Sequence, residues 1–202
     1  MIRYSEQSID RNDINAVNKV LKSNFLTTGP IVKKFEVNAS KKINAKFAVS
    51  FNSATSALHI ACLALGLKKN EYLWTSVNTF VASSNCALYC GGKVDFVDIE
   101  MNSFNMDLDK LEEKLYKTKL RNKKLLPKIV VPVVFAGNSI NMLRLKRLSK
   151  KYKFYILEDA SHGYGAKFKK HYIGCGKYSD ITVFSFHPFC LLYTSPSPRD
   201  RG

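Results

Sequence analysis

Apolar residues near the start of the chain recur at the spacing of an α-helix. A first helix is predicted after Asp10, whose side chain suits a helix N-cap, because apolar positions follow at helical intervals (Ile14, Val17 and Leu21). A polar turn at 24–30 then breaks this pattern. Pro30 suits the first turn of a second helix, which is predicted to carry Val32, Phe35 and Ala39.

From residue 47 onward, short apolar runs alternate with helical patterns. The runs predict strands at 47–51, 72–76, 94–99, 129–135, 154–157 and 180–186. Pro132 is an awkward member of its strand because it has no N–H. The intervening patterns predict helices at 54–65, 80–89, 108–117 and 140–152. Apolar strands separated by helices indicate an α/β fold, with a mostly parallel sheet and helices on both faces.

Length and composition fit one soluble globular domain. The chain has 202 residues, of which 46% are hydrophobic and 24% charged. It has no apolar run of about 18 residues, so no membrane span is expected. Its polar start lacks the apolar core of a secretory signal, which makes the cytoplasm the expected location. The cysteines are odd in number and irregularly spaced, so no metal site is expected (Cys62, Cys86, Cys90, Cys175 and Cys190).

The chain is strongly basic, with 32 Lys and Arg against 16 Asp and Glu and a net charge of +16. Such an excess can indicate a nucleic-acid partner. The lysines are scattered over predicted helices and loops, however, which favours a solvated surface and predicts no nucleic-acid partner. Attraction of an anionic substrate, such as a nucleotide diphosphate, is compatible with this charge.

Four segments that follow predicted strands are expected to meet at one edge of the sheet, where ligands of such folds bind. The first, at 52–57, leads into a helix whose first N–H groups can approach an anion closely. An ordinary N-cap is the alternative interpretation of its Ser and Thr residues. The second segment carries Phe80, a ring that either stacks on a flat cofactor or belongs to the core.

The other two segments carry an acid and a hydroxyl group. Asp159 ends an apolar strand, where a buried carboxylate is costly without a cationic partner. A protonated pyridine nitrogen is one such partner, and an acid that caps a loop is the alternative. His162 is expected to face the same pocket, and Ser185 to donate its hydroxyl to a phosphate.

In this order and spacing the segments, with the TTGP turn near the N-terminus, resemble the DegT/DnrJ/EryC1/StrS family of sugar-nucleotide aminotransferases. The stretches that carry the resemblance are FNSATSALH, TFVASSNCALYCGGKVDFVDI, VVFAGNS, ILEDASHGYGA and YSDITVFSFHP. The likeness as a whole spans residues from about Tyr4 to Pro188. The resemblance implies the aspartate aminotransferase fold, fold type I of the pyridoxal-phosphate enzymes, with this chain supplying the large domain.

The resemblance also implies roles for individual residues. The set that would bind pyridoxal 5′-phosphate is Ala54, Thr55, Phe80, Asp159, His162 and Ser185. The first two and the last would contact the phosphate, Phe80 would stack on the ring, Asp159 would pair with the ring nitrogen, and His162 would lie beside the ring. The set that would contact the sugar nucleotide is Tyr4, Asn24, Phe25, Leu26 and Thr27.

The resemblance ends at Cys190, where the family carries the lysine that forms a Schiff base with the cofactor. The residues that follow, LLYTSPSPRD, depart from the family pattern as well. A single replacement would have kept the flanking pattern, so 190–202 is expected to be a non-native tail from vector, adaptor or misassembled sequence. The part at 1–189 is expected to be the N-terminal segment and a partial large domain. The family's small C-terminal domain is missing, and the chain is expected to be inactive.

For an intact relative, the resemblance implies transfer of an amino group from an amino acid, usually glutamate, to a keto sugar. The expected acceptor is the 4-keto carbon of a UDP-linked 4-keto-6-deoxy-N-acetylhexosamine, in the biosynthesis of pseudaminic acid-type glycans by a homodimer. Two alternatives remain. One is a dehydratase of the same family, in which histidine replaces the lysine, and the other is a non-catalytic binder of nucleotide or nucleic acid.

Overall fold

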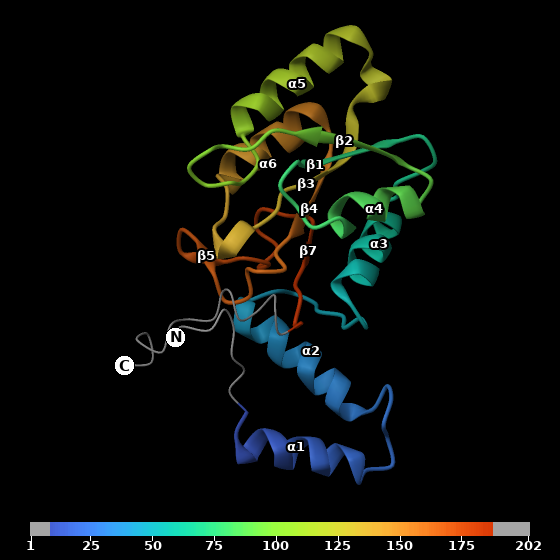
Figure 1. The fold of residues 1–202 in the computed structure, drawn as a ribbon, viewed down its shortest axis with the longest axis vertical. Helices are drawn as coiled ribbons and strands as arrows, with labels where there is room; N and C mark the ends of the chain where they lie inside the picture. The colour runs from blue at the N-terminus through green and yellow to red at the C-terminus, as the bar shows by residue number, and fades with distance from the viewer. Residues whose placement is uncertain (1–8, 188–202) are drawn as a thin grey trace, which may run out of the picture.

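Five parallel strands form the central sheet of the computed structural model, which describes residues 9–187. The strand order is β2-β1-β3-β4-β7 (Figure 1). The strands are β1 (Tyr72–Ser76), β2 (Lys93–Val97), β3 (Pro127–Val131), β4 (Tyr155–Asp159) and β7 (Ile181–Val183). Because all neighbouring pairs are parallel, the carboxyl ends of the strands lie at one edge of the sheet.

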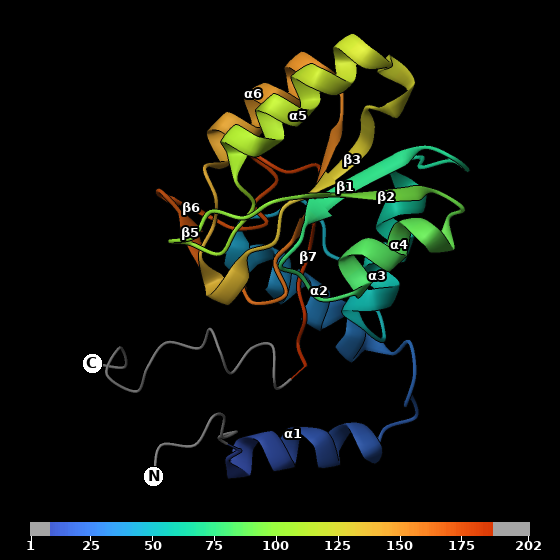
Figure 2. The ribbon, with the colours of Figure 1, turned by 45° about the horizontal axis from the view of Figure 1, so that its top comes forward.

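Helices cover both faces of this sheet, as the alternation of strands and helices predicts (Figure 2). Helices α5 (Leu108–Arg121) and α6 (Met142–Tyr152) lie on one face, and α3 (Ala54–Ala64) and α4 (Ala82–Tyr89) on the other. Successive strand residues alternate between two cores: Trp74, Val130 and Ile156 pack with α5 and α6, whereas Leu73, Ile129 and Leu157 pack with α3 and α4. The fold class is therefore confirmed.

The two predicted N-terminal helices are present as α1 (Arg11–Leu21) and α2 (Pro30–Ile43). Asp10 caps α1 through a capping box with Asp13. No residue of α1 is buried, and the helix stands apart from the sheet beyond α2 (Figures 1 and 2). Helix α2 instead packs against the end of the described chain, where the rings of Phe35 and Phe186 lie 5.0 Å apart.

The strand predicted at 47–51 is wrong. This segment is irregular, and its apolar side chains Phe47 and Val49 are largely exposed. The backbone N–H of Ser50 donates to the Glu36 carboxylate at 2.9 Å instead of to a neighbouring strand. An apolar run without a strand partner therefore stays outside the sheet.

Other boundaries differ from the prediction in smaller ways. The strand predicted at 129–135 ends at Val131, because Pro132 cannot donate to a ladder. Phe135 lies instead in the short 3-10 helix η2 (Phe135–Gly137). The strand predicted at 180–186 shortens to three residues, and the helix predicted at 80–89 begins at Ala82. Elements not predicted are the 3-10 helix η1 (Lys123–Leu125) and the hairpin of β5 (Lys167–Phe168) and β6 (His171–Tyr172).

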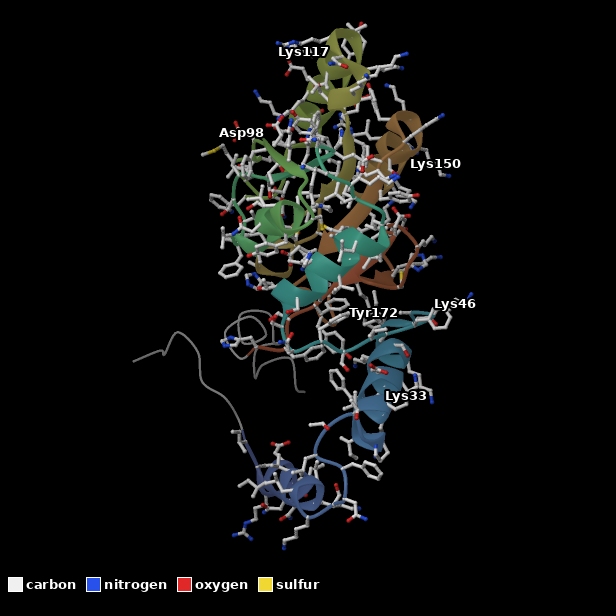
Figure 3. All side chains as sticks on the ribbon, turned by 90° about the vertical axis from the view of Figure 1, so that its right-hand side faces the viewer. Lys33, Lys46, Asp98, Lys117, Lys150 and Tyr172 are labelled. Carbon is white, nitrogen blue, oxygen red and sulfur yellow. The ribbon has the colours of Figure 1, made fainter. Side chains whose placement is uncertain are left out.

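Cysteines and lysines occupy ordinary structural positions. Cys62 and Cys86 are fully buried in the core under α3 and α4, and hydrogen bonding to Cys86 together with burial raises the pKa of the Cys62 thiol. The lysines labelled in Figure 3 are spread along the molecule rather than gathered in one stripe. Within residues 9–187, no helix combines the length and apolar character needed to cross a bilayer.

Candidate functional site

Asp159 is a buried acid at the carboxyl end of β4, with 3% of its surface exposed. Its Oδ1 accepts from the N–H and the hydroxyl of Ser161, at 3.1 and 2.7 Å. Its Oδ2 accepts from the hydroxyl of Ser83. Among the described residues no Lys, Arg or His forms an ion pair with it, so the carboxylate has donors but no protein cation.

Helix α3 directs its N-terminus toward the same edge. Ser53 caps the helix and accepts from the N–H of Ser56 at 3.1 Å. The N–H groups of Ala54 and Thr55 have no acceptor within residues 9–187. Ala54 packs against the core that contains strand residues of β4 and β7, so this turn lies over the last two strands. Two unpaired N–H groups at a helix start suit a phosphate.

Ser185 follows β7 and is buried, with 7% of its surface exposed. Its Oγ accepts from the N–H of His187 at 3.2 Å. The hydroxyl proton has no acceptor among the described residues, so it is available to a ligand. The N–H of Ala160 donates to the carbonyl of Val183 at 2.8 Å, which ties the segment after β7 to the segment after β4.

Phe80 is 72% exposed, so the interpretation that it belongs to the core is wrong. It lies in the connection between β1 and α4, and its carbonyl accepts from the N–H of Ser83 at 3.0 Å. The exposed ring is therefore carried by the same turn that delivers the Ser83 hydroxyl to Asp159.

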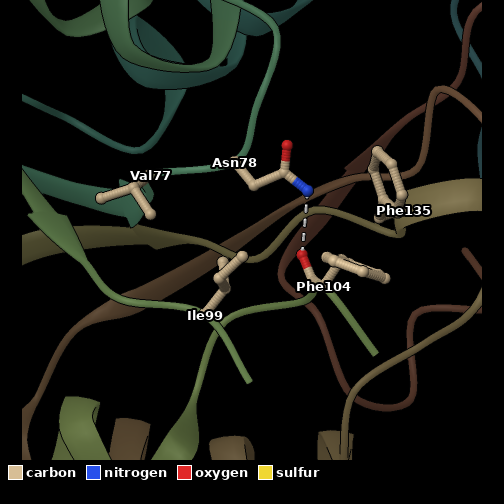
Figure 4. A pocket seen from close by; sticks show the side chains of 5 residues that line it. All are labelled: Val77, Asn78, Ile99, Phe104 and Phe135. Atoms are coloured by element: carbon tan, nitrogen blue, oxygen red, sulfur yellow. Dashed lines mark hydrogen bonds between the residues drawn. The ribbon is translucent and has the colours of Figure 1, made fainter. Parts of the chain in front are cut away.

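His162 lies in the turn after β4 and is partly exposed. Its ring centroid is 6.4 Å from that of Phe135, which in turn lies 6.2 Å from that of Phe104. These rings lead to a shallow, largely apolar pocket of about 490 Å³ lined by Val77, Asn78, Ile99, Phe104 and Phe135 (Figure 4). Asn78 closes one side by donating to the carbonyl of Phe104 at 3.1 Å.

Glu158, which precedes Asp159, belongs to the opposite face of the sheet. It is almost fully buried, and its Oε2 accepts from the hydroxyls of Ser179 and Thr182 at 3.1 and 2.9 Å. Burial raises the pKa of this carboxyl above its ordinary value, although the two hydroxyl donors oppose the rise. The strand thus carries one acid toward the candidate site and one away from it.

The residues predicted to contact the sugar nucleotide are not brought together with this edge. The stretch Asn24 to Thr27 lies in the exposed connection between α1 and α2, at the end of α2 that points away from the sheet (Figure 1). Tyr4 and Cys190 lie outside the described residues. The predicted roles of all these residues stay predictions.

The residues at the edge fit a phosphate-bearing aromatic cofactor. The free N–H groups of α3 and the Ser185 hydroxyl supply donors for a phosphate, and Asp159 supplies an anion that has no cationic partner in the described part of the chain. Phe80 offers an exposed ring face. In contrast, the described residues hold no group of three or more His, Cys, Asp or Glu that could bind a metal ion.

Three residues near Asp159 were not singled out from the sequence. Ser83, Thr79 and Ser161 form its hydrogen-bond environment, with the Thr79 hydroxyl donating to that of Ser83 at 2.8 Å. The sequence carries no signal that singles out Ser83, because the adjacent Ser84 is a buried serine of the same helix.

The fold and this edge define a pyridoxal-phosphate-type aminotransferase large domain. The family profile of the DegT/DnrJ/EryC1/StrS aminotransferases matches residues 7–195, and the chain belongs to that family.

Individual members of the family are similar to this chain in sequence and in structure. The chain is 44% identical over 188 residues to the UDP-4-amino-4,6-dideoxy-N-acetyl-beta-L-altrosamine transaminase of Campylobacter jejuni, which covers 93% of this chain and 48% of the relative. Among solved structures, it resembles Helicobacter pylori PseC, an aminotransferase involved in the biosynthesis of pseudoaminic acid, with a TM-score of 0.79 and 33% identity over 92% of this chain and 48% of that one.

A Bacillus subtilis protein, NtdA, solved with bound cofactor PMP, is also similar, with a TM-score of 0.75 and 32% identity over 87% of this chain and 37% of that one. The chain spans about half the length of the curated relatives it matches. Its likeness therefore concerns the part of the fold that carries the sheet and the edge described above.

Proposed function

We propose that this chain is the cofactor-binding part of a pyridoxal-phosphate-dependent aminotransferase that acts on a sugar nucleotide. The observation that carries the proposal is the buried Asp159 carboxylate, which has hydrogen-bond donors but no cationic partner within residues 9–187. It lies on the same sheet edge as the unpaired N–H groups of α3. When bound, the cofactor supplies an electron-withdrawing pyridinium ring.

The positions of the chain's residues support the following proposed roles. Ala54, Thr55 and Ser185 bind the phosphate, which fixes one end of the ring. Asp159 holds a proton on the ring nitrogen at the other end, since a desolvated carboxylate favours a cationic neighbour. Phe80 covers one face of the ring, and His162 lies beside it.

The proposed reaction is transfer of an amino group, with glutamate as donor, to the 4-keto carbon of a UDP-linked 4-keto-6-deoxy-N-acetylhexosamine. Support comes from the identity to the Campylobacter transaminase and from the likeness to PseC. The net charge of +16 is compatible with an anionic substrate. Tyr4 and the stretch Asn24 to Thr27 are proposed to contact the nucleotide, in a homodimer located in the cytoplasm.

The chain with Cys190 is proposed to be catalytically silent. The reaction needs an amine that both carries the cofactor and moves a proton, and a thiol at this position provides neither. A same-family dehydratase needs histidine there, so it is not favoured. Residues 190–202 are proposed to be foreign to the native protein, and 1–189 to be the native part.

Binding of pyridoxamine 5′-phosphate tests the proposal without requiring turnover. The purified chain is titrated with this compound by calorimetry, and saturable one-to-one binding is expected. Asp159→Asn should weaken binding at least about tenfold, because a charge-assisted contact is lost. The matched control is Asp98→Asn, which changes an exposed acid just after β2 and should leave binding unchanged. Absence of saturable binding to the unmodified chain would contradict the proposed function.

Retention on immobilised DNA distinguishes the binder alternative. Since the lysines are scattered, we expect only weak retention that disappears at moderate salt. Tight retention that persists with increasing salt would favour the nucleic-acid alternative.

A further inference from the structure

We propose that Ser83 is a positioning residue, which holds the Asp159 carboxylate in a fixed relation to the turn that carries Phe80. This inference rests on the proposed function, because it concerns how the chain presents those two residues to a pyridoxal-type ring. It adds a residue that belongs to neither the predicted cofactor set nor the predicted substrate set.

The direction of the hydrogen bonds at Ser83 is determined by its neighbours. Thr79 donates its hydroxyl proton to the Ser83 Oγ at 2.8 Å. The single proton of Ser83 is therefore directed to Oδ2 of Asp159, which accepts only. Ser83 is fully buried, so water does not compete for this contact. A buried hydrogen bond to a charged group is among the stronger ones in proteins.

The two oxygens of Asp159 are held from different elements. Oδ1 is held by Ser161, only two residues later in the sequence. This contact alone would connect the carboxylate to no element beyond the turn after β4. Oδ2 is held by Ser83, which lies 76 residues away on α4. Among the described residues, Ser83 is the one hydrogen-bond donor from another element that reaches the Asp159 carboxylate.

The same residue also fixes the turn before α4. Its backbone N–H donates to the carbonyl of Phe80 at 3.0 Å, while its side chain reaches Asp159. The residue that would cover the ring face and the residue that would hold the ring nitrogen are thus connected through one serine. Loss of the Ser83 hydroxyl would leave the fold intact. The Asp159 carboxylate would then be held only through Oδ1, by Ser161, and could turn about its Cβ–Cγ bond.

The adjacent Ser84 provides a matched control. It is also buried and lies in the same helix, but its hydroxyl donates to the carbonyl of Val81 at 2.9 Å within its own turn. Ser83→Ala and Ser84→Ala remove the same atom from neighbouring buried positions. Only Ser83→Ala should remove a hydrogen bond to the Asp159 carboxylate.

The test uses the full 202-residue chain and pyridoxamine 5′-phosphate labelled with ¹⁵N in the ring. Ser83→Ala is expected to raise the dissociation constant by about tenfold, the effect of one hydrogen bond to a charged group. It is also expected to shift the ring ¹⁵N signal toward the unprotonated form. Ser84→Ala should change the dissociation constant less than about twofold and leave the signal in place. In an Asp159→Ala background, Ser83→Ala should have no further effect on binding, because the group through which it acts is absent.

Each outcome decides one question. If the unmodified chain binds the compound and Ser83→Ala matches Ser84→Ala in both readouts, the positioning role is wrong while the proposed function stands. If the unmodified chain does not bind, both fall. Thermal melting checks the fold of each variant. If Ser83→Ala fails to melt cooperatively, Ser83→Cys, which keeps a side chain of similar shape but is only a weak donor, tests the same contact, and an unchanged ¹⁵N signal there would overturn the role.

Discussion

Glu158 and Asp159 are consecutive on β4, yet their carboxyl groups are held on opposite sides of the sheet. Asp159 accepts from Ser83 and Ser161 at the candidate site. Glu158 accepts from the hydroxyls of Ser179, which precedes β7, and Thr182, which lies in β7. Neither acid has a lysine, arginine or histidine partner among residues 9–187. The strand therefore carries one acid available for function and one that bears only on stability.

Glu158 should make stability depend on pH. Burial raises the pKa of this carboxyl above its ordinary 4.5, so above that value the folded chain keeps a proton that the unfolded chain releases. Stability should fall as pH rises through this window, by up to about 1.4 kcal/mol for each pH unit. The side chain of the Glu158→Gln variant cannot ionise. The unfolding free energy of this variant, minus that of the unmodified chain, should therefore increase as pH rises. Urea unfolding between about pH 5 and about pH 8 measures the difference.

The control for this prediction is Glu113→Gln, which changes an exposed acid whose pKa is lowered by Lys117. Because the pKa of Glu113 is lowered rather than raised, the Glu113→Gln variant should not become more stable relative to the unmodified chain as pH rises. A Glu158→Gln curve parallel to that of the unmodified chain would show that Glu158 ionises normally in the folded state.

Gly174 should tolerate no side chain. It has a φ of +81°, and a Cβ there would lie 2.6 Å from the ring of Phe184. Gly174→Ala should cost about 1–2 kcal/mol for the left-handed backbone and about 1–3 kcal/mol more for overpacking. Gly176→Ala is the matched control, since its φ is +74° but no atom lies within 4 Å of the added Cβ. Equal losses in denaturant melts of the two variants would show that the Phe184 ring moves aside.

Arg144 joins α6 to α5. Its guanidinium contacts Asp109 at 2.6 Å and Glu112 at 2.9 Å, and the latter carboxylate holds the pKa of Arg144 above its ordinary value. Because the group is partly exposed, Arg144→Ala should lower the unfolding free energy by only about 1 kcal/mol, and by less in high salt. Arg147→Ala on the exposed side of α6 should change it little. A loss that is independent of salt would point to packing of the Arg144 stem instead.

Trp74 packs its ring in the core but leaves its Nε1 without a hydrogen-bond partner among the described residues. Trp74→Phe loses some packing and also removes the unpaired N–H, whose burial costs about 1–3 kcal/mol. The two effects should offset each other to within about 1 kcal/mol, whereas Trp74→Ala should cost about 3–5 kcal/mol. Thermal melts followed by far-UV circular dichroism compare the three chains. A large loss in Trp74→Phe would indicate that Nε1 finds a partner in solution.

The alternation of strands and helices could be predicted because it depends on local pattern. The strand at 72–76 and the start of the helix at Ala54 agree with the structure. Both signals lie in adjacent residues, namely the apolar Tyr72 to Trp74 for the strand and the Ser53 N-cap for the helix. The segment at 47–51 has the same local pattern but failed, because the Glu36 side chain takes the Ser50 N–H. Whether an apolar run joins a sheet depends on a partner elsewhere in the chain.

The candidate site also contains residues that the sequence indicates and residues that it does not. The sequence pointed to Asp159 because an acid at the end of an apolar strand is unusual, and the structure places it buried at the carboxyl edge. Nothing local to Ser83 indicates a contact with a residue 76 positions later. The exposure of Phe80 could not be predicted either. An aromatic residue that follows a strand gives the same sequence pattern whether it faces the core or solvent.

The edge position of β7 has a consequence for synthesis on the ribosome. Strands β1 to β4, with the helices that cover them, are all translated before β7, which then adds to the rim of a sheet that can already be assembled. Ser185 takes its place only after that addition, whereas the N-terminus of α3 is made much earlier. The proposed binding of a phosphate by both is therefore a late event in biogenesis, and a ligand of this edge can stabilise the assembled sheet but cannot template its early folding.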